Sequence, residues 1–168
     1  MFILARAVVY ASLFIGVLLV FLPARVVARS GIPAPAGWGA EQVLGLLFVI
    51  AGAVLAVSCI LAFAFIGRGT PAPFDPPRRL VVRGPYRWVR NPMYVGAGTA
   101  LLGAALYYDS LPLLAYGIGF LLAMHLFVVL YEEPVLRRAF GPEYEEYRRR
   151  VGRWWPRLGS RNPTGPRM

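Results

Sequence analysis

The sequence predicts an all-α, polytopic membrane protein with about four transmembrane helices and a charged, helical C-terminal tail. Hydrophobic residues make up 58% of the 168 positions, whereas soluble domains usually hold about 45–50%. The apolar residues gather in long blocks, and most charged residues lie between these blocks or near the C-terminus. A membrane-spanning helix needs roughly 20 mostly apolar residues, and three of the blocks reach that length. The whole chain, residues 1–168, is predicted to form a single membrane domain.

The first two blocks predict a pair of N-terminal transmembrane helices within residues 1–66. Residues 2–22 carry one charge and end before Pro23. We interpret this block as a retained anchor and not as a cleaved signal peptide, because its apolar run is too long and no clear small-x-small cleavage site follows it before Pro23. The second helix is expected over residues 41–66, after a loop at residues 23–40 that is rich in Pro, Gly and Ala.

The remaining two blocks predict an antiparallel helical hairpin. One helix begins at Pro92 and covers the short apolar block 92–106, and its partner covers residues 111–131. The polar turn at residues 108–110 is so short that the two helices must be neighbours. The start of the first helix and the end of the second therefore lie at the same membrane face.

The charges predict the orientation in the membrane. All 18 basic residues are arginine, and the net charge is +10. Arginines concentrate in residues 67–90 and in the tail from residue 132 onward, so both segments are expected in the cytoplasm. Four spans then place both termini there, although the loop at 23–40 lies outside with two arginines of its own.

Composition also limits the biological setting. Arginine without lysine, together with abundant Ala, Gly and Pro, is typical of a GC-rich bacterial genome and predicts the bacterial inner (plasma) membrane. Because the arginines follow the positive-inside pattern, no nucleic-acid partner is expected. The single Cys59 is interpreted as a packing residue, no metal site is predicted, and residues 158–168 are expected to be a flexible tail.

The hairpin brings two polar segments together, with Arg90, Asn91 and Tyr94 close to Glu132 and Glu133. The helix start favours an anion through its free N–H groups, and an arginine fork suits a carboxylate. Adjacent carboxylates can bind an ammonium group or ribose hydroxyls. These groups fit a zwitterionic, purine-bearing, cationic cofactor, with aromatic side chains stacking on the purine or facing the cation.

A purely structural interpretation of the same residues is also open. Asn91 is a good N-cap and Pro92 suits the first helical position, as at any helix start. The two glutamates could pair along one helix with Arg137 and Arg138. Aromatic residues at a membrane interface are commonly belt residues.

The string Gly84-Pro85-Tyr86-Arg87-Trp88-Val89-Arg90-Asn91-Pro92-Met93-Tyr94-Val95-Gly96 resembles the first signature of isoprenylcysteine carboxyl methyltransferases and related phospholipid methyltransferases. That signature is Arg-His-Pro-x-Tyr-x-Gly, followed further along by Glu-Glu, which here is Glu132–Glu133. The similarity continues to Arg153-Trp154-Trp155-Pro156 and covers residues 80–157.

The resemblance implies a membrane methyltransferase core at 80–157 without a Rossmann domain, using S-adenosylmethionine and releasing S-adenosylhomocysteine. The family pattern assigns the cofactor pocket to Arg90, Asn91, Pro92, Tyr94, Gly96, Glu132 and Glu133, closed by Tyr144 and Tyr147. Asn91 stands where the family has His, so a mechanism that uses that His as an acid or base does not transfer.

The acceptor decides the remaining catalytic roles. A carboxylate acceptor needs a positive group to orient it, for which Arg87 and Arg148 are candidates. An amine must lose a proton, and then His125 or Glu132 is the candidate base. His125 could instead be hydrogen-bonded to Ser58, Thr99 or a backbone carbonyl.

The expected activity is methyl transfer to the carboxylate of an isoprenylcysteine-like or other small lipophilic acceptor that enters from the bilayer. A phospholipid N-methyltransferase is the alternative. A non-enzymatic four-helix transporter or scaffold is a second alternative, although the first three predicted helices lack the carboxylate that a proton-coupled transporter would use. The sequence does not fix the oligomeric state.

Overall fold

The computed structural model describes residues 15–67 and 79–157, and every regular element in these ranges is helical. The predicted all-α fold class is therefore confirmed for this part of the chain. The predicted tail at 158–168 and most of the first predicted helix lie outside the described residues.

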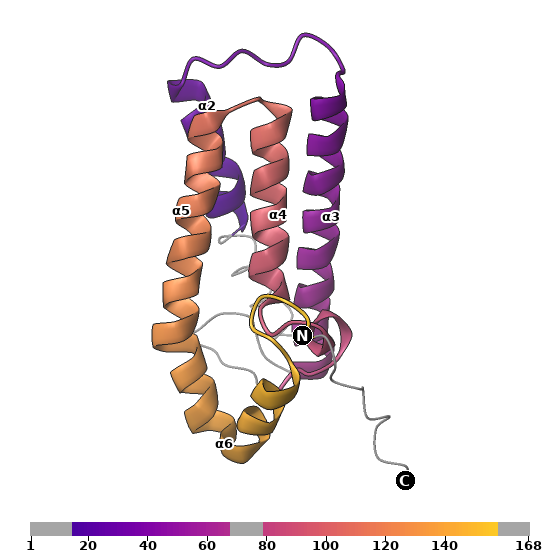
Figure 1. The fold of residues 1–168 in the computed structure, drawn as a ribbon, viewed down its shortest axis with the longest axis vertical. Helices are drawn as coiled ribbons and strands as arrows, with labels where there is room; N and C mark the ends of the chain where they lie inside the picture. The colour runs from indigo at the N-terminus through magenta and orange to yellow at the C-terminus, as the bar shows by residue number, and fades with distance from the viewer. Residues whose placement is uncertain (1–14, 68–78, 158–168) are drawn as a thin grey trace.

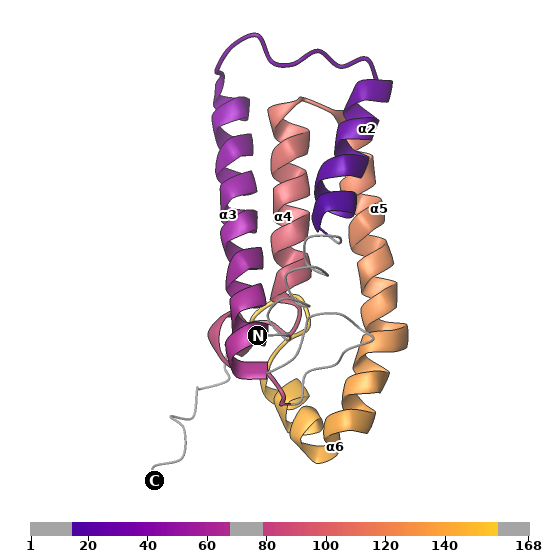
Figure 2. The same cartoon turned by 180° about the vertical axis from the view of Figure 1, so that it is seen from behind.

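The described chain forms an upright bundle with a short, folded-back end (Figures 1 and 2). In chain order the elements are η1 (Ile15–Phe21), α2 (Leu22–Arg29), α3 (Ala40–Ala62), η2 (Phe63–Gly67), η3 (Gly84–Arg87), α4 (Pro92–Tyr107), α5 (Leu111–Phe127), η4 (Val128–Glu132) and α6 (Glu133–Arg150). Helices α3, α4 and α5 stand side by side, and α2 packs behind them near the upper end of α5.

Glycines bring the backbones of α3 and α4 into direct contact. A Cβ atom built on Gly96 would lie 2.8 Å from the carbonyl oxygen of Gly52, and one built on Gly103 would lie 2.5 Å from that of Gly45. Small residues at this spacing allow close helix approach where no hydrophobic effect drives association. This contact fixes α4, and with it the site at the start of α4, against the N-terminal half of the chain.

Helices α4 and α5 form the predicted antiparallel hairpin, joined by a turn in which Asp109 has a φ of 45°. Ser110 caps α5 by accepting a hydrogen bond from the backbone N–H of Leu113 at 3.2 Å. The two helices share a buried cluster that is continued by side chains of η1: Ala97, Leu101, Phe120, Leu18 and Leu19.

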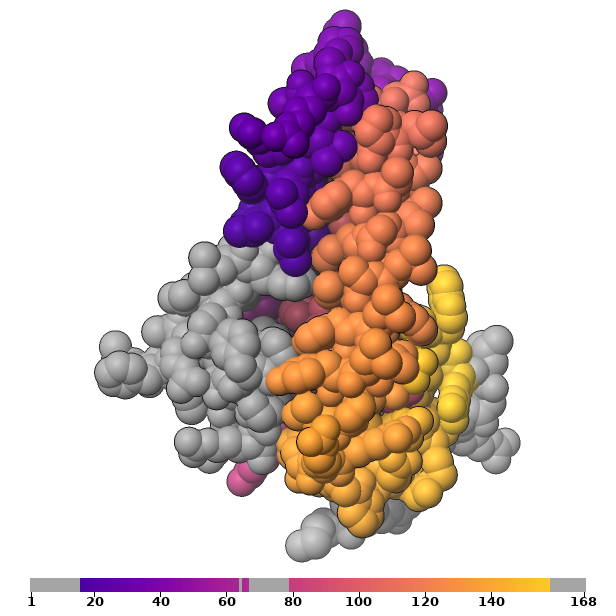
Figure 3. Space-filling model, turned by 90° about the vertical axis from the view of Figure 1, so that its left-hand side faces the viewer, coloured from indigo at the N-terminus to yellow at the C-terminus, as the bar shows by residue number. Residues whose placement is uncertain are grey.

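The predicted end of the first helix, before Pro23, is wrong. The helical path continues from η1 through Pro23 to Arg29, and Pro23 stands where the π-helical segment gives way to the first turn of α2. The hydroxyl of Tyr116 in α5 donates to the carbonyl of Leu18 at 2.7 Å. Figure 3 shows the resulting contact of this N-terminal segment with α5.

The fourth helix does not end at residue 131, as the sequence predicted. Helix α5 continues through η4, a π-helical turn, directly into α6. The path then bends at Gly141, whose φ of 48° and ψ of −121° are not helical, and Pro142 follows it. Glycine adopts such a backbone conformation at little cost, so the chain turns back toward the start of α4 (Figure 1).

Two described helical runs are long and apolar enough to cross a membrane: Ala40–Ala62 and the 40-residue run Leu111–Arg150. Together they support membrane association. Helix α4 has 16 residues and is shorter than the roughly 20 residues that a span needs. Four spans and a cytoplasmic tail therefore remain predictions.

Candidate active site

Glu133, at the start of α6, is the centre of a buried ion cluster. Its Oε1 lies 2.9 Å from Nη1 of Arg90. Arg153 holds the same carboxylate with two hydrogen bonds, from Nε to Oε1 at 2.7 Å and from Nη2 to Oε2 at 2.9 Å. The Glu133 residue is only 4% exposed, so the pairing compensates a charge that would be costly to bury alone.

Glu132 has a different partner from its neighbour. The hydroxyl of Tyr94, in the first turn of α4, donates to Oε2 of Glu132 at 3.1 Å. The glutamate pair thus contacts the start of α4 through two separate side chains, Arg90 and Tyr94. The alternative interpretation, in which these glutamates pair with Arg137 and Arg138, is wrong. Arg137 instead pairs with Glu145 at 3.1 Å, and Arg138 has no ion pair among the described residues.

The start of α4 is tied to the chain that follows α6. The backbone N–H of Arg90 donates to the carbonyl of Gly152 at 2.8 Å. Asn91 stands at the N-cap position but makes no side-chain cap hydrogen bond. Its Nδ2 group donates to the carbonyl of Arg153 at 3.3 Å. The amide therefore joins two segments of the chain, and Pro92 is buried beside it.

Tyr144 and Tyr147 pack beneath the ion cluster. The hydroxyl of Tyr144 accepts from Nη1 of Arg90 at 3.2 Å, and the hydroxyl of Tyr147 donates to the carbonyl of Tyr86 at 2.6 Å. Burial raises the pKa of the Tyr86 phenol well above its ordinary value. The phenol of Tyr86 therefore stays neutral at any physiological pH.

The cluster keeps its charges and some unused hydrogen-bonding capacity. The hydrogen bond to the carboxylate of Glu133 raises the pKa of Arg153, so this guanidinium stays cationic. The buried Nε groups of Arg90 and Arg148 have no hydrogen-bond partner among the described residues. Buried donors are normally satisfied, so Arg90 retains a donor that the surrounding protein does not use.

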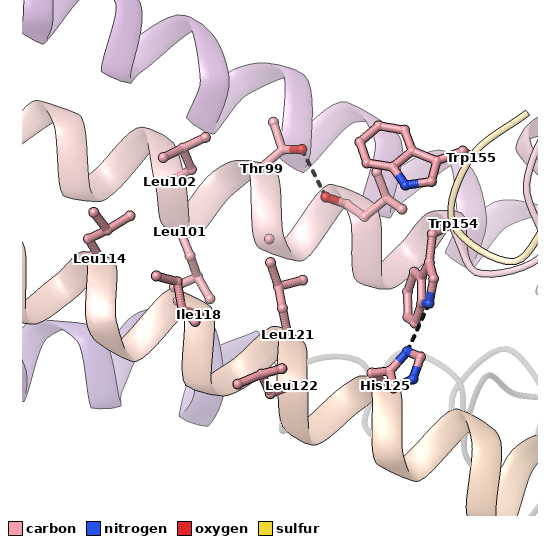
Figure 4. Close-up of a pocket in the computed structure, with 13 residues that line it drawn as sticks. Thr99, Leu101, Leu102, Leu114, Ile118, Leu121, Leu122, His125, Trp154 and Trp155 are labelled. Carbon is pink, nitrogen blue, oxygen red and sulfur yellow. Dashed lines mark hydrogen bonds between the residues drawn. The ribbon is translucent and has the colours of Figure 1, made fainter.

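An apolar cavity of about 630 Å³ lies between α4 and α5 (Figure 4). This volume is within the roughly 300–1,000 Å³ of small-molecule sites. Leu102 and Leu114 lie at one end, and His125 and Trp154 at the other. The remaining lining residues are Val95, Gly98, Thr99, Leu101, Gly117, Ile118, Leu121, Leu122 and Trp155.

His125 is hydrogen-bonded at the end of this cavity, but its partner is neither Ser58 nor Thr99, the two side chains considered from the sequence. Nε1 of Trp154 donates to Nδ1 of His125 at 3.1 Å. Thr99 instead donates to the carbonyl of Val95 at 2.9 Å, and Ser58 to that of Val54 at 2.8 Å. With Nδ1 as an acceptor, the proton of the neutral imidazole is assigned to Nε2.

Three residues assigned to the site lie apart from the ion cluster. Gly96 faces α3, where it contacts Gly52. The guanidinium of Arg87 lies over the exposed ring of Trp88, 5.0 Å from its centroid. Arg148 is nearer, but its Nη1 bonds both carboxylate oxygens of Glu145, each at 3.1 Å.

Arg153 is a residue of the site to which sequence reasoning gave no role, and Trp154 was expected only as one of the aromatic side chains that could stack on a purine or face a cation. The first holds Glu133, and the second closes the apolar cavity beside His125. The sequence signal for Arg153 was its place in the string that extends the family resemblance to Pro156. Among the described residues, no group of three or more His, Cys, Asp or Glu side chains is placed to hold a metal ion.

Comparison with protein families identifies the relationship. The family model for phospholipid methyltransferases matches residues 40–143, more than half of the chain. The chain belongs to this family. The family consists of membrane methyltransferases and includes the isoprenylcysteine carboxyl methyltransferases, so the resemblance carried by the two linked motifs is confirmed. The match spans α3 to α6 and therefore includes Arg90, Tyr94 and the glutamate pair.

Among curated proteins, the chain is similar to the nickel-cobalt-cadmium resistance protein NccN of Alcaligenes xylosoxydans xylosoxydans. The two are 33% identical over 114 residues, which cover 65% of this chain and 53% of NccN. The chain therefore spans about half the length of that relative. No solved structure shows significant similarity.

Proposed function

We propose that this family member transfers a methyl group from S-adenosylmethionine to a small lipophilic acceptor. The observation that carries the proposal is the apolar cavity of about 630 Å³ between α4 and α5, placed beside a buried cluster of arginines and glutamates. A membrane methyltransferase must bring a charged, water-soluble donor to an apolar acceptor, and these two features meet the two requirements.

Two residues that line the cavity directly follow residues of the ion cluster in the sequence. Tyr94 bonds Glu132, and the next residue, Val95, lines the cavity. Likewise Arg153 holds Glu133, and the next residue, Trp154, lines the cavity. The cavity and the cluster are therefore joined at two points of the chain, which supports the transfer of a small group between them.

The residues of the cluster fit S-adenosylmethionine. The unused Nε donor of Arg90 suits the carboxylate of the amino-acid part, and the carboxylate of Glu132 suits its ammonium group or the ribose hydroxyls. Glu133 is already bonded by two arginines, so we assign it to positioning Arg90 and Arg153. When bound, the cofactor supplies a methyl group on a sulfonium.

The protein's own contribution is to orient the acceptor and exclude water. Holding the reacting groups in line lowers the entropic part of the activation barrier. The rings of Trp154 and His125 close one end of the cavity. Because Nδ1 of His125 accepts from Trp154 and Nε2 carries the proton, His125 is set to donate a hydrogen bond and not to remove a proton. That arrangement favours a carboxylate acceptor, which needs no general base.

The alternative acceptor is the amine of a phospholipid headgroup. In that case Glu132 is the candidate base, because Tyr94 donates to one of its oxygens and holds it at the cluster.

The metal resistance in the name of NccN is not extended to this chain, because about half of that protein lies outside the match.

The proposal includes a topology. The end of α3, the start of α4 and the turn in α6 lie at one end of the bundle. The arginines of residues 79–90 and 148–157 gather at that end, and positive charge favours the cytoplasm. We place the site and both termini on the cytoplasmic side of a bacterial inner membrane.

Binding of S-adenosylhomocysteine to the purified, detergent-solubilised protein tests the proposal. Calorimetry is expected to show saturable binding, and Glu132→Gln is expected to weaken it by at least about tenfold, or 1.4 kcal/mol. Glu146→Gln is the matched control, because Glu146 pairs only with Arg149 and Arg150 at the surface. No binding to the intact protein, or an equal loss in both variants, would overturn the assignment.

A labelled-methyl screen then separates the acceptors. Membrane protein is incubated with labelled S-adenosylmethionine and either prenylcysteine analogues and fatty carboxylic acids or phosphatidylethanolamine. Base-labile methyl esters identify a carboxylate acceptor, and base-stable methylamines identify the phospholipid alternative. Product from neither set, with S-adenosylhomocysteine binding intact, would exclude both acceptor classes.

A further inference from the structure

A second cavity, of about 540 Å³, is lined by residues of η2, which follows α3, and by residues further along the chain. It shares no lining residue with the apolar cavity between α4 and α5. Its walls come from the end of η2, from residues 79–83 and from α6 around the bend at Gly141. The proposed methyl transfer uses none of these walls.

Cationic side chains without partners form one side of this cavity. Arg79 and Arg83 both line it, and neither forms an ion pair or hydrogen bond among the described residues. Arg90 and Arg153, by contrast, are both held by Glu133. Glu143 also lines the cavity without an ion pair, so two positive charges face one negative charge.

Apolar side chains form the other side. Phe65 is 74% exposed and Val82 is 41% exposed, and both line the cavity. Phe65 stands three residues beyond Ala62, where the apolar helix α3 ends, which is about 4.5 Å at the helical rise. In the topology proposed above, the cavity then lies near the end of a membrane-crossing helix, close to the level of lipid headgroups.

We propose that this cavity binds the phosphate of an anionic membrane lipid. The guanidinium groups of Arg79 and Arg83 hold the phosphate, since two planar forks can each donate paired hydrogen bonds to it. The acyl chains lie along Phe65 and Val82. Free phosphate has the same charged group but no apolar part that could pack against Phe65 and Val82, so we assign the cavity to the lipid. The proposal is independent of methyl transfer.

The test measures the thermal stability of the full-length protein in detergent, because a ligand that binds only the folded state raises Tm. Phosphatidylglycerol at about a hundred times its dissociation constant is expected to raise Tm by roughly 5–10 °C. Phosphatidylcholine with the same acyl chains, and inorganic phosphate alone, are expected to raise it by less than about 2 °C.

The double variant Arg79→Gln/Arg83→Gln is expected to lose most of the shift. The matched control is Arg25→Gln/Arg29→Gln, which removes the same charge from α2 at the opposite end of the bundle, and it is expected to keep the shift. If the first double variant does not fold, Arg83→Gln alone replaces it, with at least half of the shift expected to disappear.

Three results would each overturn the proposal. Equal shifts with phosphatidylglycerol and phosphatidylcholine would show that any lipid suffices. An equal loss in the two double variants would show a general charge effect. A full shift with inorganic phosphate would show a site for the free anion. Because no readout involves S-adenosylhomocysteine or methyl transfer, failure here is distinguishable from failure of the proposed activity.

Discussion

Arg153 donates two hydrogen bonds, of 2.7 and 2.9 Å, to the carboxylate of Glu133, which lies twenty residues earlier in the sequence. The same carboxylate pairs with Arg90 at 2.9 Å. One buried glutamate therefore joins the start of α4, the start of α6 and the chain beyond α6. This shared carboxylate is the observation behind the positioning role that we propose for Glu133.

Removing this glutamate is expected to destabilise the protein strongly. Glu133→Ala leaves the guanidinium of Arg90 buried without a counter-charge, for which about 3–5 kcal/mol is typical. Denaturant unfolding in detergent measures the change. Glu146→Ala, which removes a surface partner of Arg149 and Arg150, is the control, and it is expected to leave the free energy of unfolding nearly unchanged. Similar losses in both variants would contradict the role of Glu133 as the buried link.

Adding one methyl group is expected to have opposite effects on two faces of the bundle. In Gly96→Ala the new Cβ meets the carbonyl of Gly52 at 2.8 Å, so α3 and α4 must separate, at about 1–3 kcal/mol. In Gly119→Ala the new Cβ meets nothing within 4 Å, and the helix gains up to about 1 kcal/mol from propensity. Thermal unfolding of both variants measures the contrast. A stable Gly96→Ala protein would disprove the close packing.

The hydrogen bond between Trp154 and His125 is expected to show as a coupling energy. Trp154→Phe keeps an aromatic ring but removes the N–H that His125 accepts. A double-mutant cycle with His125→Ala, measured by unfolding, is expected to give about 0.5–1.5 kcal/mol. The same cycle with Trp155→Phe is the control, because Trp155 is 82% exposed and makes no described hydrogen bond. Equal couplings in both cycles would refute the contact.

Filling the apolar cavity is expected to impair use of the acceptor without affecting the donor. Gly117 lines the cavity, and a Cβ there would lie at an ordinary 3.4 Å from Leu101, so Gly117→Leu can project into the cavity. We expect KM for the lipophilic acceptor to rise by about tenfold or more, with S-adenosylhomocysteine affinity unchanged. The matched control is Gly119→Leu on the open side of α5. An unchanged KM in the Gly117 variant would place the acceptor elsewhere.

Local and periodic features of the fold were predictable from the sequence. The apolar blocks indicated the helices at 40–62 and 92–107 and the start of α5 at Leu111 to within a few residues, although not the continuation of α5 into α6. The short polar turn before Leu111 indicated the hairpin. The hairpin in turn predicted that Arg90 and Tyr94 approach the glutamate pair, as the structure has them. These features depend on residues that are near one another in the chain, so composition and spacing are enough to predict them.

The pairing of distant side chains was decided only by the tertiary structure. Eighteen arginines offered many partners for Glu133, and which of them reach it depends on the bend at Gly141, which returns the chain to α4. For the same reason the sequence could not show that Gly96 faces α3 or that Trp154 bonds His125. The apolar pattern alone determined a membrane-associated helical protein with a motif-bearing hairpin. Long-range packing decided which of its charges are buried together, because burial selects the one arrangement in which each buried charge has a partner.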